Sequence, residues 1–291
     1  VKTAASAAPP SSGYTDRWLQ RNLLNFSELA LHPTLLANLR DQGFERPTPI
    51  QAESIPPALA GKNLVGLAQT GTGKTAAFVL PILQRLSAGR PGGVRALIVT
   101  PTRELAEQVN ATVVSLGRGM GLRSAVIYGG VGMIPQERAL RAGVDIVVAC
   151  PGRLLDHMGR GTVRLDRVEI LVLDEADRMF DMGFLPAIRR ILQALPAKRQ
   201  TMLFSATLAP ELRELVASAA PEAVTVQIGQ VRPAHTIAHA LYPVPNHHKT
   251  GLLLELLRHA NTGSVLIFTR TKHRANRLLQ LIVREGHSAA A

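Results

Sequence analysis

The sequence predicts an α/β fold in which helices cover a parallel β-sheet. Short apolar segments recur between residues 63 and 228 and alternate with helical segments, which is the pattern of a parallel sheet. A glycine-rich segment joins the first of these strands to the next helix, as in proteins that bind nucleotide phosphates. Further unusual motifs follow the carboxyl ends of later strands. Because ligands of parallel sheets bind beyond those ends, the motifs should converge on one edge.

The chain before the first strand is expected to contain short helices. Residues 1–13 are rich in Ala, Ser and Pro, so residues 1–21 are predicted to form a disordered lead-in. Helical character follows in pieces up to residue 42. Within it, Pro33 suits a first helical turn and Gly43 ends the segment.

Another helix is predicted to start at Thr48. Thr48, Pro49 and Gln51 have the spacing of a capping box, in which the Gln51 side chain bonds back to the cap residue. On this interpretation Gln51 only closes a helix. A role in ligand recognition competes with it, because a glutamine folded back to cap cannot also present both of its amide groups to a ligand.

The segment 68–75, AQTGTGKT, fits the phosphate-loop pattern between a strand at residues 63–67 and a helix over residues 76–80. Its glycines let the backbone wrap closely around an anion, and its N–H groups supply positive partial charge. Lys74 adds a full charge for the β- and γ-phosphates, and Thr75 offers a hydroxyl to Mg²⁺. Ala68 departs from the first glycine of the pattern. The alternative is a chance turn rich in Gly and Thr.

Six further strands are predicted before residue 229. They cover residues 95–100, 123–128, 145–150, 168–173, 199–204 and 223–228. The intervening helices are expected over residues 104–116 and 135–141 and from residues 151–153 onward. The strand at 168–173 ends in Asp174 and Glu175, which would hold the Mg²⁺ shell and orient an attacking water respectively. A solvated acidic turn is the alternative.

A linker over residues 230–236 is predicted to lead into a second, shorter unit at residues 237–291. Strands are expected at residues 237–244 and 264–268, and helices at residues 247–259 and 271–285. Such a unit is too short for another sheet of the first kind, so we expect it to be incomplete.

Composition limits the partners and the location. The net charge of +12 favours a polyanionic partner, most simply nucleic acid, although an arginine-rich chain can also be basic from base composition alone. Aromatic residues make up only 4%, so contacts to the nucleic-acid backbone are favoured over base stacking. One cysteine excludes a disulfide framework and fits a reducing, cytoplasmic location. No apolar run reaches the roughly 18 residues of a membrane span.

The order and spacing of these motifs resemble the DEAD-box ATP-dependent RNA helicases. Residues 174–177 spell DEAD, and residues 68–75 resemble motif I, where Ala is usual at the first position. The Q-motif would cover residues 26–51. The other matches are residues 101–106 (motif Ia), 129–130 (the GG motif), 151–153 (motif Ib), 205–207 (motif III) and 266–270 (motif IV). Residues 154–156 and 181–184 look like bacterial members of the RhlE type.

The resemblance spans about residues 22–287. It implies a first RecA-like domain of the P-loop NTPase class at residues 22–229 and the N-terminal part of a second RecA-like domain at residues 237–291.

The resemblance also implies a site for ATP and Mg²⁺. Lys74, Asp174 and Glu175 would be catalytic, and Thr75 and Asp174 would hold the metal. The ATP-binding set would be Phe26, Arg46, Thr48, Gln51, Gln69, Thr70, Gly71, Thr72, Gly73, Lys74 and Thr75. In this set Gln51 would read the adenine edge, and Phe26 would stack on the base.

The implied RNA site would bind the backbone of the strand. Its members would be Pro101, Thr102, Arg103, Gly129, Gly130, Gly152 and Arg153, with Thr269 from the second domain. Thr102 as a helix cap and Arg153 as an ordinary helix residue are the alternatives. Ser205 and Thr207 would bond to the carboxylates of motif II, notably Asp177, and couple hydrolysis to domain motion.

The implied function is ATP-dependent unwinding or remodelling of RNA, with no membrane partner. Two alternatives remain open, namely an ATP-gated nucleic-acid-binding or assembly module without unwinding activity and a helicase directed at DNA. Motifs V and VI of the family would follow residue 291. We therefore expect this chain to bind ATP, to hydrolyse it slowly and not to unwind RNA alone.

Overall fold

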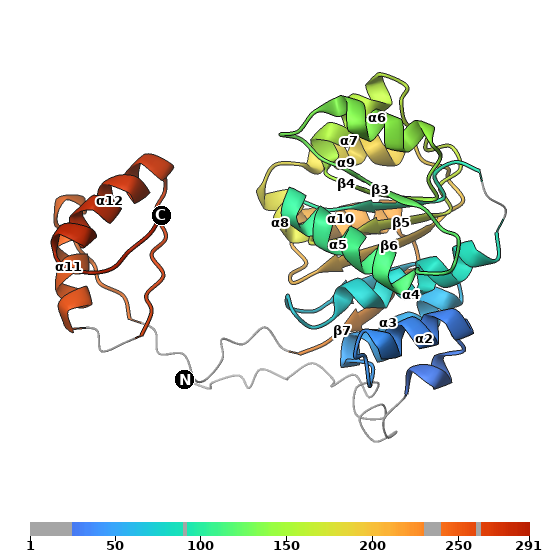
Figure 1. The fold of residues 1–291 in the computed structure, drawn as a ribbon, viewed down its shortest axis with the longest axis horizontal. Helices are drawn as coiled ribbons and strands as arrows, with labels where there is room; N and C mark the ends of the chain where they lie inside the picture. Colours follow the sequence, from blue (N-terminus) through green and yellow to red (C-terminus); the bar gives the residue numbers. More distant parts are fainter. Residues whose placement is uncertain (1–24, 90–91, 230–239, 260–262) are drawn as a thin grey trace, which may run out of the picture. The chain divides into compact units, whose positions relative to one another are not determined.

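The computed structural model describes residues 25–89, 92–229, 240–259 and 263–291. The chain divides into two compact units, Val1–Val231 and Arg232–Ala291, and each is described by itself (Figure 1). The predicted lead-in at residues 1–21 and the predicted linker at residues 230–236 lie outside the described residues.

The larger unit is built on a seven-stranded sheet in which every neighbouring pair of strands is parallel. The strand order is β3-β4-β2-β5-β6-β1-β7. The strands are β1 (Leu64–Leu67), β2 (Ala96–Val99), β3 (Ser124–Ile127), β4 (Ile146–Ala149), β5 (Ile170–Leu173), β6 (Gln200–Ser205) and β7 (Val224–Gln227). The predicted parallel α/β class is therefore confirmed.

Helices cover both faces of this sheet (Figure 1). One apolar cluster joins the sheet to α2 (Pro33–Asp41), α3 (Pro49–Leu59), α4 (Lys74–Ser87) and α5 (Arg103–Leu116), with the short helix η1 (Phe26–Leu29). The other joins it to α7 (Pro151–Gly159), α8 (Ala176–Asp181), α9 (Leu185–Gln193) and α10 (Pro210–Ala219), with α6 (Met133–Arg141) packed beside it. Successive strand residues alternate between the two clusters, as Leu97 and Ile98 do, because side chains of a strand point to opposite faces. No helix among the described residues is long and apolar enough to cross a membrane.

The smaller unit contains η2 (Asn246–His248), α11 (Lys249–His259) and α12 (Lys272–Arg284). The strand predicted at residues 264–268 is wrong, and so is the part of the 237–244 strand that falls on residues 240–244; residues 237–239 lie outside the described residues. A strand needs a hydrogen-bonded neighbour, and none pairs with these segments in the described part of this unit.

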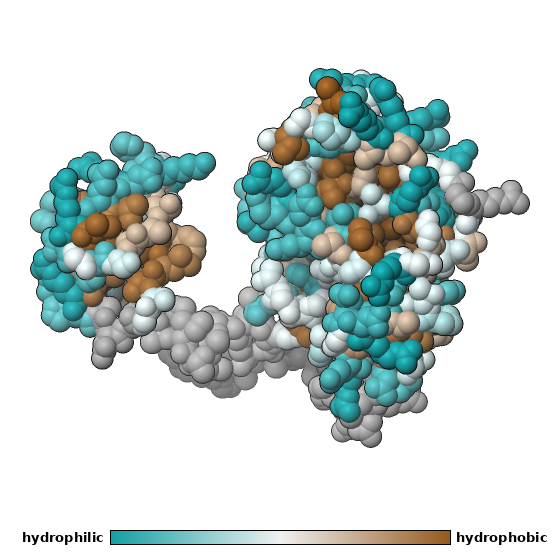
Figure 2. All heavy atoms as spheres, viewed as in Figure 1, coloured by the Kyte–Doolittle hydropathy of each residue, from teal (hydrophilic) through white to brown (hydrophobic). Residues whose placement is uncertain are grey.

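Three of the four apolar side chains of the 264–268 segment are consequently left in solvent. Val265, Leu266 and Phe268 are 50%, 80% and 88% exposed. Figure 2 shows apolar residues gathered on the visible face of this unit.

A buried ion pair ties together the amino-terminal ends of β2 and β4. Arg95 Nη2 lies 2.9 Å from Asp145 Oδ1, with the two side chains 5% and 10% exposed. Arg95 Nη1 also donates to the Leu86 carbonyl at 2.9 Å, and Asp145 Oδ2 accepts the backbone N–H of Arg123 at 3.0 Å. A buried charge is tolerated when it is paired and hydrogen-bonded in this way. Removal of one partner is destabilising because it leaves the other charge buried and uncompensated.

Replacing Asp145 by Ala should lower the free energy of unfolding by about 3–5 kcal/mol, because Arg95 would remain buried without its counter-charge. Urea unfolding followed by circular dichroism measures the change. The matched control is Asp166→Ala, since Asp166 pairs with Arg164 on the surface, where the side chains are 57% and 84% exposed. Exposed pairs contribute about 0–1 kcal/mol, so equal losses in the two variants would contradict the prediction.

Candidate functional site

The carboxyl edge of the sheet gathers the predicted motifs into two neighbouring groups. Strands β1, β5 and β6 form one block of the sheet, and they are followed by residues 68–75, 174–177 and 206–207. Strands β2, β3 and β4 form the other block, and they are followed by residues 101–103, 129–130 and 150–153. The blocks meet where β2 pairs with β5. The residues predicted to bind ATP phosphates and those of the larger unit predicted to bind RNA therefore occupy adjacent halves of one edge.

The phosphate loop is closed by its own hydrogen bonds. Lys74, the first residue of α4, is 7% exposed, and its ammonium donates to the Ala68 carbonyl at 2.7 Å. Thr72 Oγ1 donates to the Gln69 carbonyl at 2.7 Å. Gly71 and Gly73 have φ angles of 81° and 92°, which side chains other than hydrogen rarely allow. An anion entering this loop would compete with the Ala68 carbonyl for the Lys74 ammonium.

Gln51 fastens the phosphate loop to the start of α3. Its Oε1 accepts the backbone N–H of Thr48, the N-cap residue, at 2.9 Å, and its Nε2 donates to the Gly73 carbonyl at 3.0 Å. The side chain is 1% exposed. The structure thus places Gln51 in the capping role, with both ends of its amide occupied. Adenine recognition by Gln51 stays a prediction that requires these two bonds to be exchanged.

The remaining predicted base contacts differ in accessibility. Phe26 in η1 is 5% exposed, and its ring packs edge-on against Phe44 with centroids 6.1 Å apart. Stacking on a base would require this ring to become exposed, so it stays a prediction. Arg46 is exposed in the loop before α3. Thr48 Oγ1 is buried without a hydrogen-bond partner among the described residues.

The acidic pair lies where β5 ends. Asp174 is 3% exposed, and burial raises its pKa to about 7 against the opposing effect of the Lys74 charge. Its Oδ1 accepts the backbone N–H of Glu175 at 3.0 Å. Glu175 has φ 50° and ψ 51°, a left-handed conformation that costs a non-glycine residue about 1–2 kcal/mol. Such strain clusters at functional sites, which favours a functional role for this turn.

The donor set at this edge suits Mg²⁺ bound together with a nucleotide. Asp174 offers a carboxylate and Thr75 a hydroxyl, both hard oxygen ligands of the kind that Mg²⁺ prefers. Asp174 is buried near the Lys74 charge, and a further cation would favour its charged form. These two residues are therefore the ones that would hold the metal.

Asp177 links the acidic segment to the end of β6. Its Oδ2 accepts from the backbone N–H of Ala206 and Thr207 at 3.1 and 2.9 Å and from Thr207 Oγ1 at 3.1 Å. Ser205 Oγ accepts the backbone N–H of Asp177 at 3.2 Å and donates to the Thr207 carbonyl at 2.7 Å. Partial burial acts to raise the pKa of Asp177, but the hydrogen bonds from Thr207 and its neighbours outweigh it and hold the pKa below its usual value. The expected bond to the Asp177 carboxylate is present for Thr207, whereas Ser205 bonds the Asp177 backbone N–H and not a carboxylate.

The other half of the edge presents glycines and one exposed arginine. Gly129 and Gly130 are exposed, and their backbone N–H groups make no hydrogen bond among the described residues. Thr102 caps α5, accepting the Leu105 N–H at 3.3 Å, which is the cap alternative. Arg103 is 55% exposed and pairs with Glu104 at 3.1 Å. Gly152 is exposed in the first turn of α7, whereas Pro101 is buried.

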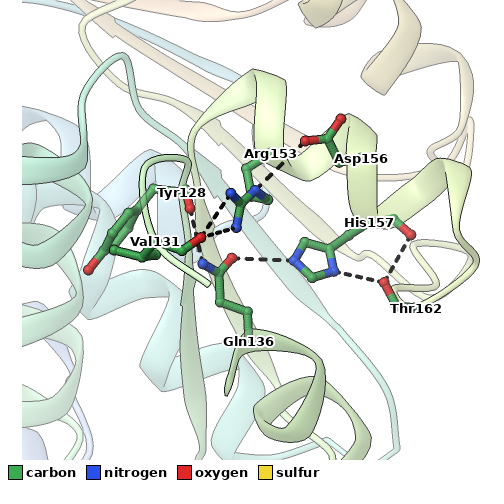
Figure 3. Close-up of polar contacts among 7 residues, drawn as sticks. All are labelled: Tyr128, Val131, Gln136, Arg153, Asp156, His157 and Thr162. Atoms are coloured by element: carbon green, nitrogen blue, oxygen red, sulfur yellow. Dashed lines mark hydrogen bonds and ion pairs between the residues drawn. The ribbon is translucent and has the colours of Figure 1, made fainter. Parts of the chain in front are cut away.

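The guanidinium of Arg153 is bonded to other residues of the chain (Figure 3). Its Nη1 and Nη2 both donate to the Val131 carbonyl at 3.1 Å, and its Nε lies 3.7 Å from Asp156 Oδ2. The side chain is 13% exposed. Pairing of Arg153 with an RNA phosphate stays a prediction that requires release of Val131. Thr269 lies in the smaller unit, where its hydroxyl donates to the Thr271 carbonyl at 3.0 Å.

The structure also shows a buried polar group that no motif had indicated. His157 is fully buried between Gln136 and Thr162, close to Arg153 (Figure 3). The three residues come from α6, α7 and the loop after α7. Their spacing in the sequence matches no ligand pattern, so only the packed structure reveals the contact.

A parallel sheet whose edge carries a glycine-rich phosphate loop beside a buried acidic pair defines a nucleotide-binding protein of the P-loop class. The family model "DEAD/DEAH box helicase" matches residues 48–215. This chain belongs to the DEAD/DEAH box helicase family.

Named relatives share most of this chain. It is 44% identical over 272 residues to "ATP-dependent RNA helicase RhlB" of Pasteurella multocida, covering 91% of this chain and 64% of the relative. It is 39% identical to "ATP-dependent RNA helicase CshA" of Limosilactobacillus reuteri, covering 92% and 54%. A crystal structure of a DEAD box protein from Methanococcus jannaschii superposes with a TM-score of 0.67 at 36% identity, covering 92% of this chain and 72% of that one. The chain thus spans between half and two thirds of these curated relatives.

Replacing Gln51 by Ala should destabilise the nucleotide-free protein by about 1–2 kcal/mol, because a helix cap and a tie to the phosphate loop are both lost. Urea unfolding without nucleotide measures the effect. Gln69→Ala is the matched control, since the Gln69 side chain is exposed and caps nothing. If the two variants unfolded alike, Gln51 would have no capping role.

Proposed function

We propose that this chain is part of an ATP-dependent RNA helicase that binds and hydrolyses ATP to open or remodel RNA duplexes locally. The observation that carries the proposal is the placement of the phosphate loop and the acidic pair beside the glycine and arginine motifs on one sheet edge. β2 and β5 are hydrogen-bonded neighbours, so ligands on the two halves would be close enough to influence each other. Membership of the helicase family and the names of the relatives support ATP and RNA as the ligands.

Each residue of the nucleotide half has a role in this proposal. Bound ATP would supply the activated phosphate, and Mg²⁺ would neutralise the charge on it. Lys74 would leave the Ala68 carbonyl for phosphate oxygens, and Thr75 and Asp174 would hold the metal. Glu175 would orient and polarise the attacking water, and its fixed backbone conformation supports that role.

The contacts of Asp177 support a coupling role. A change at Asp174 on hydrolysis would reach residues 205–207 through the hydrogen bonds of Asp177. Those residues begin the segment that leads to α10. We propose that this link carries the state of the nucleotide to the rest of the protein.

RNA would be held through its backbone on the other half of the edge. The N–H groups of Gly129 and Gly130, which have no acceptor in the described part of the chain, and the exposed Arg103 support phosphate binding there. A cytoplasmic location accords with these ligands. The RhlE-type subgroup and slow hydrolysis by this chain alone stay predictions.

Lys74→Ala should abolish nucleotide binding, whereas Glu175→Gln should keep binding and lose turnover, because one residue holds phosphate and the other acts only in the chemical step. Binding of a fluorescent ATP analogue and a phosphate-release assay separate the two effects. Glu169→Gln, an exposed residue just before β5, should change neither. Normal turnover by Glu175→Gln would remove Glu175 from the mechanism.

The affinity for single-stranded RNA should fall steeply as salt rises, with a log–log slope near −0.7 for each neutralised phosphate. Arg103→Ala should weaken RNA binding and make the slope shallower by the amount that one phosphate contact contributes. Arg164→Ala, at another exposed site, should change neither the affinity nor the slope. Fluorescence anisotropy across a salt series measures both. A flat salt response would contradict the backbone-binding model.

An oligonucleotide of the same sequence made of DNA should bind more weakly than the RNA, because 2′-hydroxyls distinguish the two.

A further inference from the structure

A buried chain of hydrogen bonds connects α7 to the glycine turn on the RNA half of the edge (Figure 3). The ring nitrogens of His157 lie 2.7 Å from Thr162 Oγ1 and 3.3 Å from Gln136 Oε1. Gln136 Nε2 donates to the Tyr128 carbonyl at 3.0 Å. Tyr128 directly precedes Gly129, so the chain of contacts ends at the turn itself.

The hydrogen bonds assign the proton of the neutral imidazole. Because Gln136 Nε2 donates to Tyr128, its Oε1 faces His157 and can only accept. His157 Nε2 therefore carries the proton, and Nδ1 is an acceptor. The Thr162 hydroxyl lies within reach of both this Nδ1 and the His157 carbonyl, 3.1 Å away, and can donate to either. Burial lowers the pKa of His157, and the nearby Arg153 charge acts in the same direction, so the neutral form of the ring is favoured. From His157 onward the donors run in one direction, through Gln136 to the Tyr128 carbonyl.

Arg153 holds the other end of the same turn. Its two terminal nitrogens donate to the Val131 carbonyl, so the turn is anchored on both sides of its glycines. Gly130 has a φ of 81°, and two consecutive glycines have much conformational freedom to lose. Without anchors at Tyr128 and Val131, the glycine N–H groups would have no fixed position.

We propose that His157 is a positioning residue for RNA binding. Acting through Gln136, it fixes the Tyr128 end of the turn and thereby the N–H groups of Gly129 and Gly130 that receive an RNA phosphate. The inference rests on the proposed function, because it assigns a role in holding RNA at the same edge. His157 is fully buried and does not itself touch RNA. The phosphate loop lies over the other half of the edge, so His157 should affect RNA affinity and leave ATP affinity unchanged.

The test replaces His157 by Phe, which keeps a ring of similar size and removes both nitrogens. The dissociation constant for a single-stranded oligouridylate, measured by fluorescence anisotropy, should rise about fivefold, the effect of one neutral hydrogen bond. Binding of a fluorescent ATP analogue without RNA should not change. His157→Gln should restore RNA affinity, because its amide can donate to Gln136 and accept from Thr162.

A double-mutant cycle tests the route through Gln136. Gln136→Leu removes the anchor directly and should weaken RNA binding at least as much as His157→Phe. Adding His157→Phe to Gln136→Leu should weaken it no further, since contacting residues in one network are not additive. If His157→Phe fails to fold, His157→Leu, which also removes both ring nitrogens, takes its place in the cycle.

Three outcomes would overturn the positioning role. They are unchanged RNA affinity in either single variant, loss of RNA and ATP affinity together, and additive effects in the double variant. A wild-type chain with no measurable affinity for the oligouridylate would instead overturn the proposed RNA function, on which the role of His157 depends.

Discussion

The parallel pairing of all seven strands is the constraint on which the rest of the larger unit depends. Parallel neighbours require a crossover after each strand, and the helices of these crossovers bury both faces of the sheet. The interiors of the strands are consequently mostly apolar, and the polar motifs follow the ends of the strands. Because every strand points the same way, one edge receives all the carboxyl ends, and the chemistry of the chain is concentrated there.

At that edge two polar side chains of the nucleotide half already have partners within the chain. Lys74 is bonded to Ala68, and Gln51 to Gly73. A buried donor without an acceptor costs free energy, so an edge without ligand is stabilised when its donors turn to backbone carbonyls. Ligand binding at such a site is an exchange of hydrogen-bond partners, and its affinity reflects the difference between the old and the new bonds.

Features made by residues that are adjacent in the sequence could be predicted from it, whereas contacts between residues far apart in the sequence could not. The strands of the larger unit were predicted because buried parallel strands read as continuous apolar runs, and the phosphate loop and acidic pair because their residues are adjacent in the chain. The segment at residues 264–268 has the composition of a strand, but pairing depends on a neighbour that composition cannot supply. Side-chain partners such as Val131 for Arg153, 22 residues apart, and Gln136 for His157, 21 apart, depend on packing between separate elements.

The backbone of Glu175 has a consequence for how this protein can change. Its positive φ is a conformation that glycine adopts without strain, whereas glutamate does not. A directed-evolution experiment selected on thermal stability alone would therefore tend to replace this glutamate by glycine and discard the carboxylate. At this position the residue that gives the highest thermal stability differs from the residue that gives the highest turnover. Selection for a more thermostable variant must therefore include selection for turnover.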